Sequence, residues 1–388
     1  MSVLRWLGFV AGLVLLAGVG SSVIKTLLIP RSAPSTFTNV VARSIRSGFR
    51  AATVRVADLQ RRERILSAAA PTFLITLLAA WLTCLLLGFG LLLWPVTPES
   101  LPAALREAGS SEFTLGFVRP AGPAPAVIVF LASASGLVLV ALLIAYLPAM
   151  YAAFNRRETL VTTLEALAGT PPWGPELLAR QALIGDIGYL HRVYERWTEW
   201  AADIAESHNN YRALIYFRSP DPAASWLLSL ICVLDAAALH QSLCPGSAPP
   251  EARPLLRVGY LTIRGLAGGL GLPVADDPHP EDPITLTRAE FDEAVARMQA
   301  AGWAFDRTPD EAWPHFHGWR VNYEGAAYAL AHFLDLPPAL WSGSRPRRRP
   351  PPQLPLRPPH REPRTGPARG PAGGEQVPGP GPRQDAVP

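Results

Sequence analysis

Charged residues are scarce in this chain. Asp, Glu, Lys and Arg make up 17% of its 388 residues, whereas soluble globular domains average about a quarter. Hydrophobic residues make up 49%, and the first 150 positions contain apolar runs long enough to cross a bilayer. This composition argues against an ordinary cytosolic enzyme and predicts a membrane protein.

Cysteine is almost absent, and the usual motifs of catalytic sites are missing. The three cysteines, Cys84, Cys232 and Cys244, are too few and too scattered for a disulfide framework or a zinc site. The chain has no Walker loop, no dinucleotide-binding fingerprint after a strand and no Gly-x-Ser-x-Gly motif. The acidic and histidine residues at 276–282 lie between prolines, which is typical of a solvated loop. We therefore expect no enzymatic activity, no cofactor and no metal site.

Most of the chain also lacks a basic surface for a nucleic-acid partner. The net charge is +4, but residues 343–388 contain nine Arg and three acidic residues, a balance of +6, so the rest of the chain sums to −2. A core of that charge does not indicate nucleic-acid binding. Segment 342–388 is rich in Pro, Arg and Gly and cannot bury a core, so we predict a disordered tail there.

Three apolar segments are long enough to span a membrane. They are Val3–Ile29, Pro71–Val96 and Ala124–Tyr151, and each exceeds the roughly 20 residues that a hydrocarbon core requires. The first segment could instead be a signal peptide. Its basic part is a single arginine, however, and its apolar part outruns the usual stretch of about 7–15 residues. We expect three transmembrane helices, the first within residues 1–30.

The distribution of arginine predicts how these helices are oriented. Residues 31–70 contain eight arginines, whereas residues 97–123 contain two. Positive charge is retained on the cytoplasmic side of a membrane. The N-terminus is therefore predicted outside, with residues 31–70 and everything after residue 151 inside. This pattern is typical of a multi-pass protein of the cell membrane with a cytoplasmic C-terminal domain.

Two further segments have alternative interpretations. Residues 31–70 form a basic segment of amphipathic character, which either lies along the anionic inner leaflet or is a solvated linker. Residues 223–239 form a fourth apolar stretch of 17 residues that includes Asp235. Because a span this short with a carboxylate inside is costly, we favour a buried helix of the cytoplasmic domain over a fourth membrane helix.

The loop at 97–123 carries the most information about function. A short helix is predicted over Glu99–Ala108. Ser100 is available as its cap, Pro102 lies in its first turn and Gly109 is expected to end it. The alternative is that residues 97–123 are an ordinary extracellular hairpin with a short polar helix.

The helix is followed by four residues with a recognisable pattern: Thr114, Leu115, Gly116 and Phe117. In this position the string resembles the pore loop of the potassium-channel family, bacterial type, in which a re-entrant helix and a Thr-Val-Gly-Tyr/Phe-Gly filter separate an outer and an inner helix. The resemblance covers residues 71–151. It implies that these four residues are a selectivity filter whose carbonyls replace the water around a monovalent, potassium-like cation. It also implies a homotetramer in the lipid bilayer.

The chain departs from the family pattern after Phe117. Leu115 replaces the usual Val, which is a mild change. Val118 replaces the second Gly, and a β-branched residue resists positive φ. Arg119 stands where Asp or Asn is common, and its charge repels cations at an outer mouth. We therefore predict a degenerate filter with a weakened outermost carbonyl site and weakened potassium selectivity.

Two residues of the third segment fit a gating helix. Gly136 lies 20 residues after Gly116, where inner helices of the family carry a hinge glycine. Pro148 removes a backbone hydrogen bond and is expected to bend the helix near its cytoplasmic end. The alternative is that the small residues around Gly136 simply allow close helix packing.

The segment 152–341 is predicted to be a helical cytoplasmic domain. Apolar residues repeat at helical spacing over Asp186–Tyr211, and Thr287 is expected to cap a helix that runs to Ala301. A third helix is predicted over residues 322–334. Ala213–Phe217 is the one candidate strand, so the fold class is all-α.

Together these features predict a potassium-like cation channel with three transmembrane helices, a re-entrant pore loop and a regulatory cytoplasmic domain. The alternative is a membrane-anchored helical scaffold or sensor without a permeation path. The two differ in oligomeric state, because two spans and one loop per chain can enclose a filter only when several copies surround an axis.

Overall fold

The computed structural model describes residues 2–29, 35–221, 223–337 and 339–342. The described residues form helices, turns and loops, with no strand among them, so the all-α prediction is confirmed. The tail predicted at 342–388 lies, beyond its first residue, outside the described residues.

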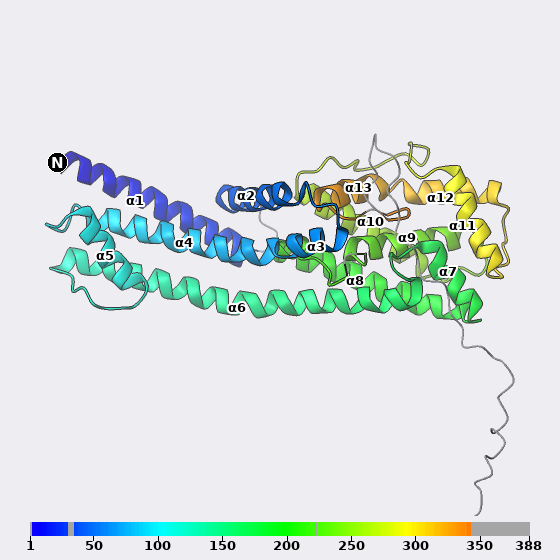
Figure 1. The fold of residues 1–388 in the computed structure, drawn as a ribbon, viewed down its shortest axis with the longest axis horizontal. Coiled ribbons are helices and arrows are strands. Elements are labelled where there is room, and N and C mark those ends of the chain that lie inside the picture. The colour runs from blue at the N-terminus through cyan, green and yellow to red at the C-terminus, as the bar shows by residue number, and fades with distance from the viewer. Residues whose placement is uncertain (1, 30–34, 222, 338, 343–388) are drawn as a thin grey trace, which may run out of the picture. The chain divides into compact units, whose positions relative to one another are not determined.

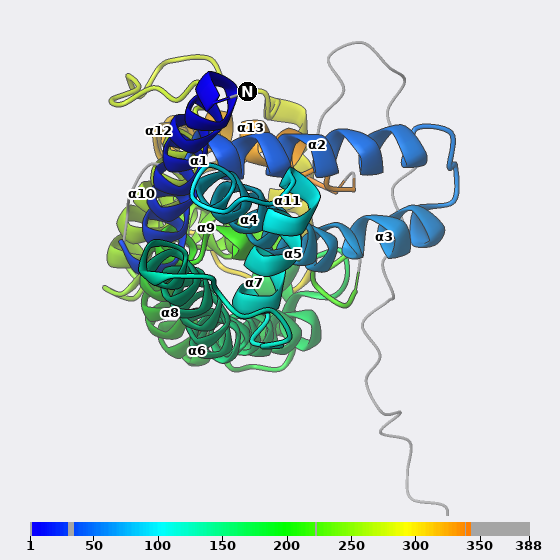
Figure 2. The ribbon, with the colours of Figure 1, turned by 90° about the vertical axis from the view of Figure 1, so that its left-hand side faces the viewer.

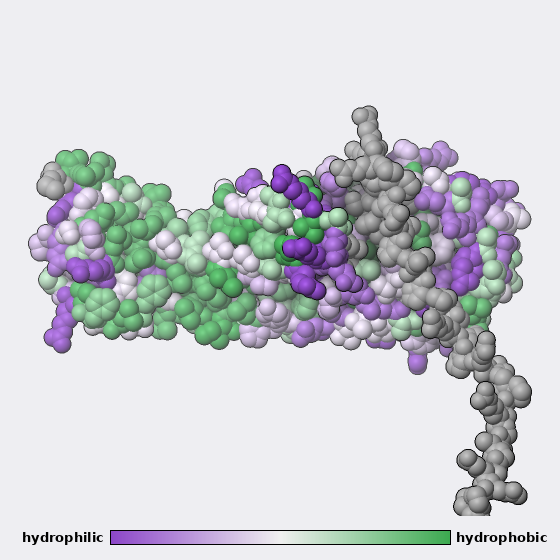
Figure 3. Space-filling view, in the orientation of Figure 1, coloured by the Kyte–Doolittle hydropathy of each residue, from purple (hydrophilic) through white to green (hydrophobic). Residues whose placement is uncertain are grey.

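Four helices are long and apolar enough to cross a membrane. They are α1 (Ser2–Val23, continued by a π-helical turn over Ile24–Leu28), α4 (Ala69–Leu93), α6 (Pro123–Ala168) and α9 (Trp226–Leu243). In Figures 1 and 2 α4 lies between α1 and the first half of α6 in one bundle. Apolar side chains cover the surface of this bundle, whereas polar side chains dominate the domain that follows (Figure 3).

The basic segment after α1 is helical. It contains α2 (Thr36–Thr53), capped by the Ser35 hydroxyl, and α3 (Leu59–Ser67), capped by the Asp58 carboxylate. α2 packs against α4, and its apolar side chains include Ile45. Figure 2 shows α4 and α6 nearly end-on but α2 from the side, so α2 lies across the bundle. The segment is therefore helical and packs partly on the bundle, and both contact with lipid and the solvated-linker alternative stay predictions.

The second part of the chain is a helical domain. It consists of the last turns of α6 together with α7 (Gly174–Leu183), α8 (Leu190–Asn210), α9, α10 (Ala252–Gly269), α11 (Arg288–Ala300), α12 (Pro309–Arg320) and α13 (Glu324–Phe333). Every residue of α9 is buried inside this domain. The buried-helix interpretation of residues 223–239 is consistent with this burial.

α6 joins the bundle to the domain without a break. It runs for 46 residues through Pro148, and its last turns contribute Leu160, Val161 and Leu164 to the domain core. The boundary predicted at residue 151 therefore falls inside one continuous helix. All the described residues belong to one compact unit, which agrees with this continuity.

The three helices predicted in the domain correspond to α8, α11 and α13, although α8 begins at Leu190 and α13 at Glu324. The apolar face predicted for Asp186–Tyr211 is buried along α8, although Ile187 precedes the helix and is exposed. Thr287 caps α11 with a capping box, and Gly302 follows the helix with φ +90°. The candidate strand is wrong: Arg212–Tyr216 is a 3-10 helix.

Candidate functional site

The short helix of the 97–123 loop folds back along α4. This helix, α5, spans Leu101–Glu112. A Cβ at Gly90 of α4 would overlap the side chain of Leu105, and one at Gly109 would lie 3.2 Å from Leu86 Cδ1. The earlier residue of α5, Leu105, meets the later residue of α4, Gly90, whereas the later residue of α5, Gly109, meets the earlier residue of α4, Leu86. The two helices are therefore antiparallel. α5 therefore re-enters the bundle.

The helix differs from its prediction at both ends. It was expected over Glu99–Ala108 with Gly109 as its end, but it continues through Gly109 to Glu112. Ser100 does occupy the N-cap position, although its hydroxyl makes no capping hydrogen bond. A single interior glycine costs about 1 kcal/mol relative to alanine. Packing of α5 against both α4 and α6 offsets that cost.

The C-terminal end of α5 meets the first half of α6 at Gly136. A Cβ at Gly136 would overlap the backbone oxygen of Glu112, so only glycine allows the two helices to approach this closely. Gly136 lies 13 residues after Pro123, the first residue of α6, which is about 20 Å at 1.5 Å per residue. α5 thus reaches about 20 Å along α6. This packing supports the close-packing interpretation of Gly136; a hinge at Gly136 or Pro148 stays a prediction.

Ser110 of α5 organises the chain that follows the helix. Its backbone oxygen accepts hydrogen bonds from the amides of Leu115 at 2.8 Å and Gly116 at 3.1 Å. Its hydroxyl accepts from the amides of Phe117 at 3.0 Å and Val118 at 3.2 Å. Four consecutive N–H groups therefore point toward one residue.

The carbonyl groups of the same peptides must point the other way. In a trans peptide the C=O of one residue lies opposite the N–H of the next, so the carbonyls of residues 114–117 are turned away from Ser110. Thr114 and Gly116 have φ angles of +55° and +70°, which let successive peptides keep this orientation. Residues 114–117 are exposed in the single chain, and no described group donates a hydrogen bond to these carbonyls. The arrangement presents a row of free acceptor oxygens.

Glu112, the last residue of α5, carries a buried carboxylate whose side chain lies against Gly136 of α6. It is 3% exposed, and neither of its oxygens has a hydrogen-bond partner among the described residues. Glu107, one turn earlier, has one such oxygen. The C-terminal end of a helix also carries partial negative charge. Buried carboxylates inside an apolar bundle are costly unless they serve a function.

The sequence analysis missed the roles of Ser110 and Glu112. The only available signal was their polarity within the string that precedes Thr114. The amides that hydrogen-bond to Ser110 depend on where α5 ends. The helix was predicted to end at Gly109, but it continues to Glu112. The predicted filter residues Thr114, Leu115, Gly116 and Phe117 do lie together in one exposed turn at the end of α5.

The ionisable residues inside the domain are engaged in structural contacts. Asp235 of α9 accepts hydrogen bonds from Arg320 and Tyr323. His240 contacts the Tyr194 hydroxyl, and burial lowers its pKa to about 4, so its ring is neutral. In the described part of the chain, no group of three or more His, Cys, Asp or Glu residues could hold a metal ion.

Comparison with known proteins adds no further constraint. Protein-family models, curated proteins and solved structures yield no match to this chain. Inference about function therefore depends on the geometry of the α4–α5–α6 module.

Proposed function

We propose that α4, α5, residues 113–122 and the first half of α6 form the pore module of a cation channel. The observation that carries the proposal is the row of carbonyls at residues 114–117, held outward by the hydrogen bonds to Ser110. Such carbonyls replace the hydration shell of an ion. Irregular backbone at membrane depth is tolerated where it lines a cavity or is buried in protein, and a pore provides that setting.

The proposed channel is a homotetramer in the cell membrane. In one chain the filter residues face outward, and the side chains of Leu115 and Phe117 are 64% and 65% exposed. A row of unpaired carbonyls and two large apolar side chains need a partner surface. Four copies around an axis supply that surface and bring the four rows together around a potassium-like cation.

In this proposal three helices cross the bilayer. α1, α4 and the first half of α6 expose large apolar side chains, including Val10, Ile75 and Phe130, and these face lipid. α9 belongs to the interior of a cytoplasmic domain, because all its residues are covered by protein. α2 and α3 lie at the inner membrane surface, and the N-terminus is outside.

One observation favours the alternative of a scaffold or sensor without a permeation path. Arg119 is exposed directly after the filter residues, and four copies at an outer mouth would repel cations. The size of the purified oligomer discriminates between the two functions. The channel requires a tetramer that passes ions in liposomes, whereas the scaffold requires neither.

Cysteine labelling tests the membrane topology. Arg106 of α5 and Arg196 of α8 are both exposed, so each can be replaced by Cys without disturbing a core. We expect an impermeant maleimide to label Arg106→Cys in intact cells and Arg196→Cys only after the cells are lysed. Among the native cysteines Cys232 and Cys244 are buried and Cys84 is half-buried in α4, so the wild-type protein is labelled in parallel as the background. Labelling of Arg196→Cys in intact cells would contradict the proposed topology.

Gly116→Ala tests the filter. Its φ is +70°, and an added Cβ would have no neighbour within 4 Å in the single chain. Alanine there introduces backbone strain of about 1–3 kcal/mol per copy without a clash within the chain. We expect potassium flux from liposomes to be abolished while expression and oligomer size are retained.

Gly109→Ala is the matched control for this experiment. Gly109 lies within α5, where an added Cβ meets only the flexible end of Leu86. We expect the potassium flux of Gly109→Ala to stay close to that of the wild type. Equal flux from the wild type and Gly116→Ala would refute the pore proposal and favour the scaffold.

A further inference from the structure

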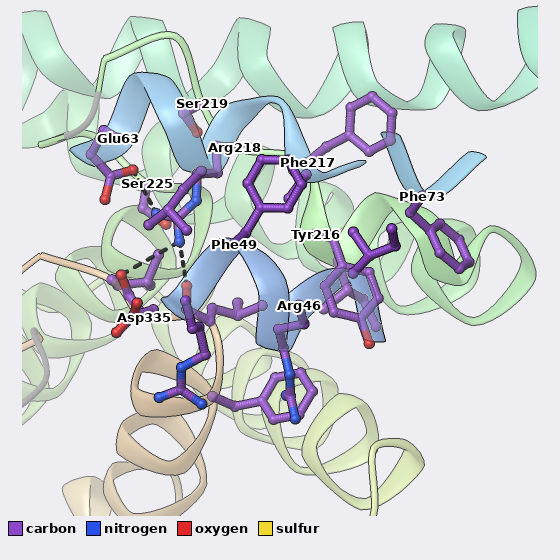
Figure 4. Close-up of a pocket in the computed structure, with 18 of the residues that line it drawn as sticks. Arg46, Phe49, Glu63, Phe73, Tyr216, Phe217, Arg218, Ser219, Ser225 and Asp335 are labelled. Atoms are coloured by element: carbon purple, nitrogen blue, oxygen red, sulfur yellow. Dashed lines mark hydrogen bonds and ion pairs between the residues drawn. The ribbon is translucent and has the colours of Figure 1, made fainter. Parts of the chain in front are cut away.

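A cavity lies where the bundle meets the helical domain. Its walls come from α2, α3 and the first turns of α4 on one side, and from residues 215–226 and 333–336 on the other. Figure 4 shows Phe49, Phe73, Tyr216 and Phe217 around it. The empty space is about 830 Å³, counting the part open to solvent.

The lining is mostly apolar. Its apolar side chains are Ala42, Ile45, Phe49, Leu66, Ala69, Phe73, Ile215, Tyr216, Phe217, Trp226, Phe333, Leu334 and Leu336. Such a surface binds hydrocarbon and does not by itself recognise a polar ligand. The polar groups at the cavity therefore determine which ligand would fit.

Some of the charges in the lining neutralise one another. Arg218 donates to Glu63 Oε2 at 2.5 Å and to the backbone oxygen of Leu334 at 2.6 Å. Asp335 pairs with Arg62 at 2.8 Å. Asp221 accepts a hydrogen bond from a backbone amide within its own turn.

Two arginines of the lining, Arg46 and Arg50 of α2, are not neutralised by a carboxylate among the described residues. Neither has an ion-pair partner in the described ranges. The Arg46 guanidinium lies 4.0 Å from the centre of the Phe333 ring, and its Nη1 is buried without a hydrogen-bond acceptor. The hydroxyl of Ser219 is also buried without a partner. Two of the buried unpartnered atoms at the cavity, Arg46 Nη1 and Ser219 Oγ, can donate a hydrogen bond, and Glu63 Oε1 is a third buried atom without a partner. Arg50 is exposed at the edge of the cavity, where its guanidinium is free to bind an anion.

We propose that this cavity binds an anionic amphiphile, with an acyl chain against the apolar lining and its charged headgroup at Arg46 and Arg50. The cavity adjoins the N-terminal end of α4, where the proposed topology puts the inner membrane surface. The amphipathic helix α2 forms one wall, so a lipid chain can enter beside it. Only this placement depends on the proposed topology, and nothing in the binding site depends on ion conduction.

Two anionic sources share this chemistry, a free fatty acid and an anionic phospholipid. The full chain in neutral detergent is titrated with dibromostearate, with brominated phosphatidylglycerol and with zwitterionic brominated phosphatidylcholine. Bromine quenches tryptophan fluorescence at short range, and Trp226 lines the cavity. We expect saturable quenching by at least one anionic probe and weaker binding of the zwitterionic one. Whichever anionic probe binds identifies the source.

Matched variants locate the site. Arg46→Gln with Arg50→Gln should weaken the anionic probe about tenfold, because charge-assisted hydrogen bonds are lost. Ala69→Trp, which fills the cavity, should abolish saturable quenching. Arg43→Gln and Ala52→Trp alter exposed residues of α2 outside the lining and should bind as the wild type does.

The proposal fails if no anionic probe binds saturably, or if the zwitterionic probe binds equally well. It also fails if the double arginine variant keeps wild-type affinity. Because quenching is measured without any flux, loss of this proposal would leave the pore proposal standing, and the reverse also holds.

Discussion

Asp235→Ala is expected to lower the free energy of unfolding by about 3–5 kcal/mol, because it leaves a buried guanidinium without its main counter-charge. Arg320 is completely buried and donates to Asp235 Oδ1 at 2.5 Å. It also donates to Glu324 Oε2 and to the backbone oxygen of Trp341, both at 2.5 Å. The network therefore joins α9, α12, α13 and the end of the described chain. Urea unfolding followed by tryptophan fluorescence measures the loss.

Two control variants distinguish the stability contribution of this buried ion pair from that of an exposed ion pair. Arg288 pairs with Asp292 and Asp310 on the exposed surface, so Arg288→Gln should cost less than about 1 kcal/mol. Asp235→Leu combined with Arg320→Met removes both charges and should recover much of the stability lost by Asp235→Ala. Similar losses from Asp235→Ala and Arg288→Gln would show that the interior network contributes little.

Local signals in the sequence were sufficient to predict most of the helices. Thr287 and Glu290 form the predicted capping box, since its two hydrogen bonds join residues three positions apart. The face of α8 was predictable because burial repeats with the helical period. The end of α5 was predicted wrongly at Gly109, because packing between α4 and α6 is a tertiary effect that a local glycine signal does not contain.

The contacts that define the sites were not predictable, because they join residues far apart in the sequence. Asp235 and Arg320 are separated by 85 positions, and nothing near either residue indicates the other. The cavity brings Arg46 of α2 next to Phe333 of α13, which requires the position of both helices. The filter string itself was visible in the sequence, but the orientation of its peptides depends on hydrogen bonds to Ser110.

Gly136→Val is expected to displace α5 from α6 and to abolish ion flux. Even the first carbon of the new side chain would overlap the Glu112 backbone oxygen, and neither helix backbone can yield without moving the loop that follows. Overpacking of this kind costs about 1–3 kcal/mol. Thermal unfolding in detergent and potassium flux from liposomes measure the two effects separately.

Gly18→Val in α1 is the matched control, because an added Cβ there has no neighbour within 4 Å, and its stability should change by less than about 0.5 kcal/mol. If Gly136→Val were as stable as Gly18→Val, α5 would not be packed against α6 and the re-entrant geometry would be wrong. A different outcome is that Gly136→Val loses stability but the wild-type tetramer carries no ion flux. In that case α5 would stabilise the packing of α4 and α6 without forming a pore. The stability measurement thus tests the fold of the module independently of conduction, and the flux measurement tests its function.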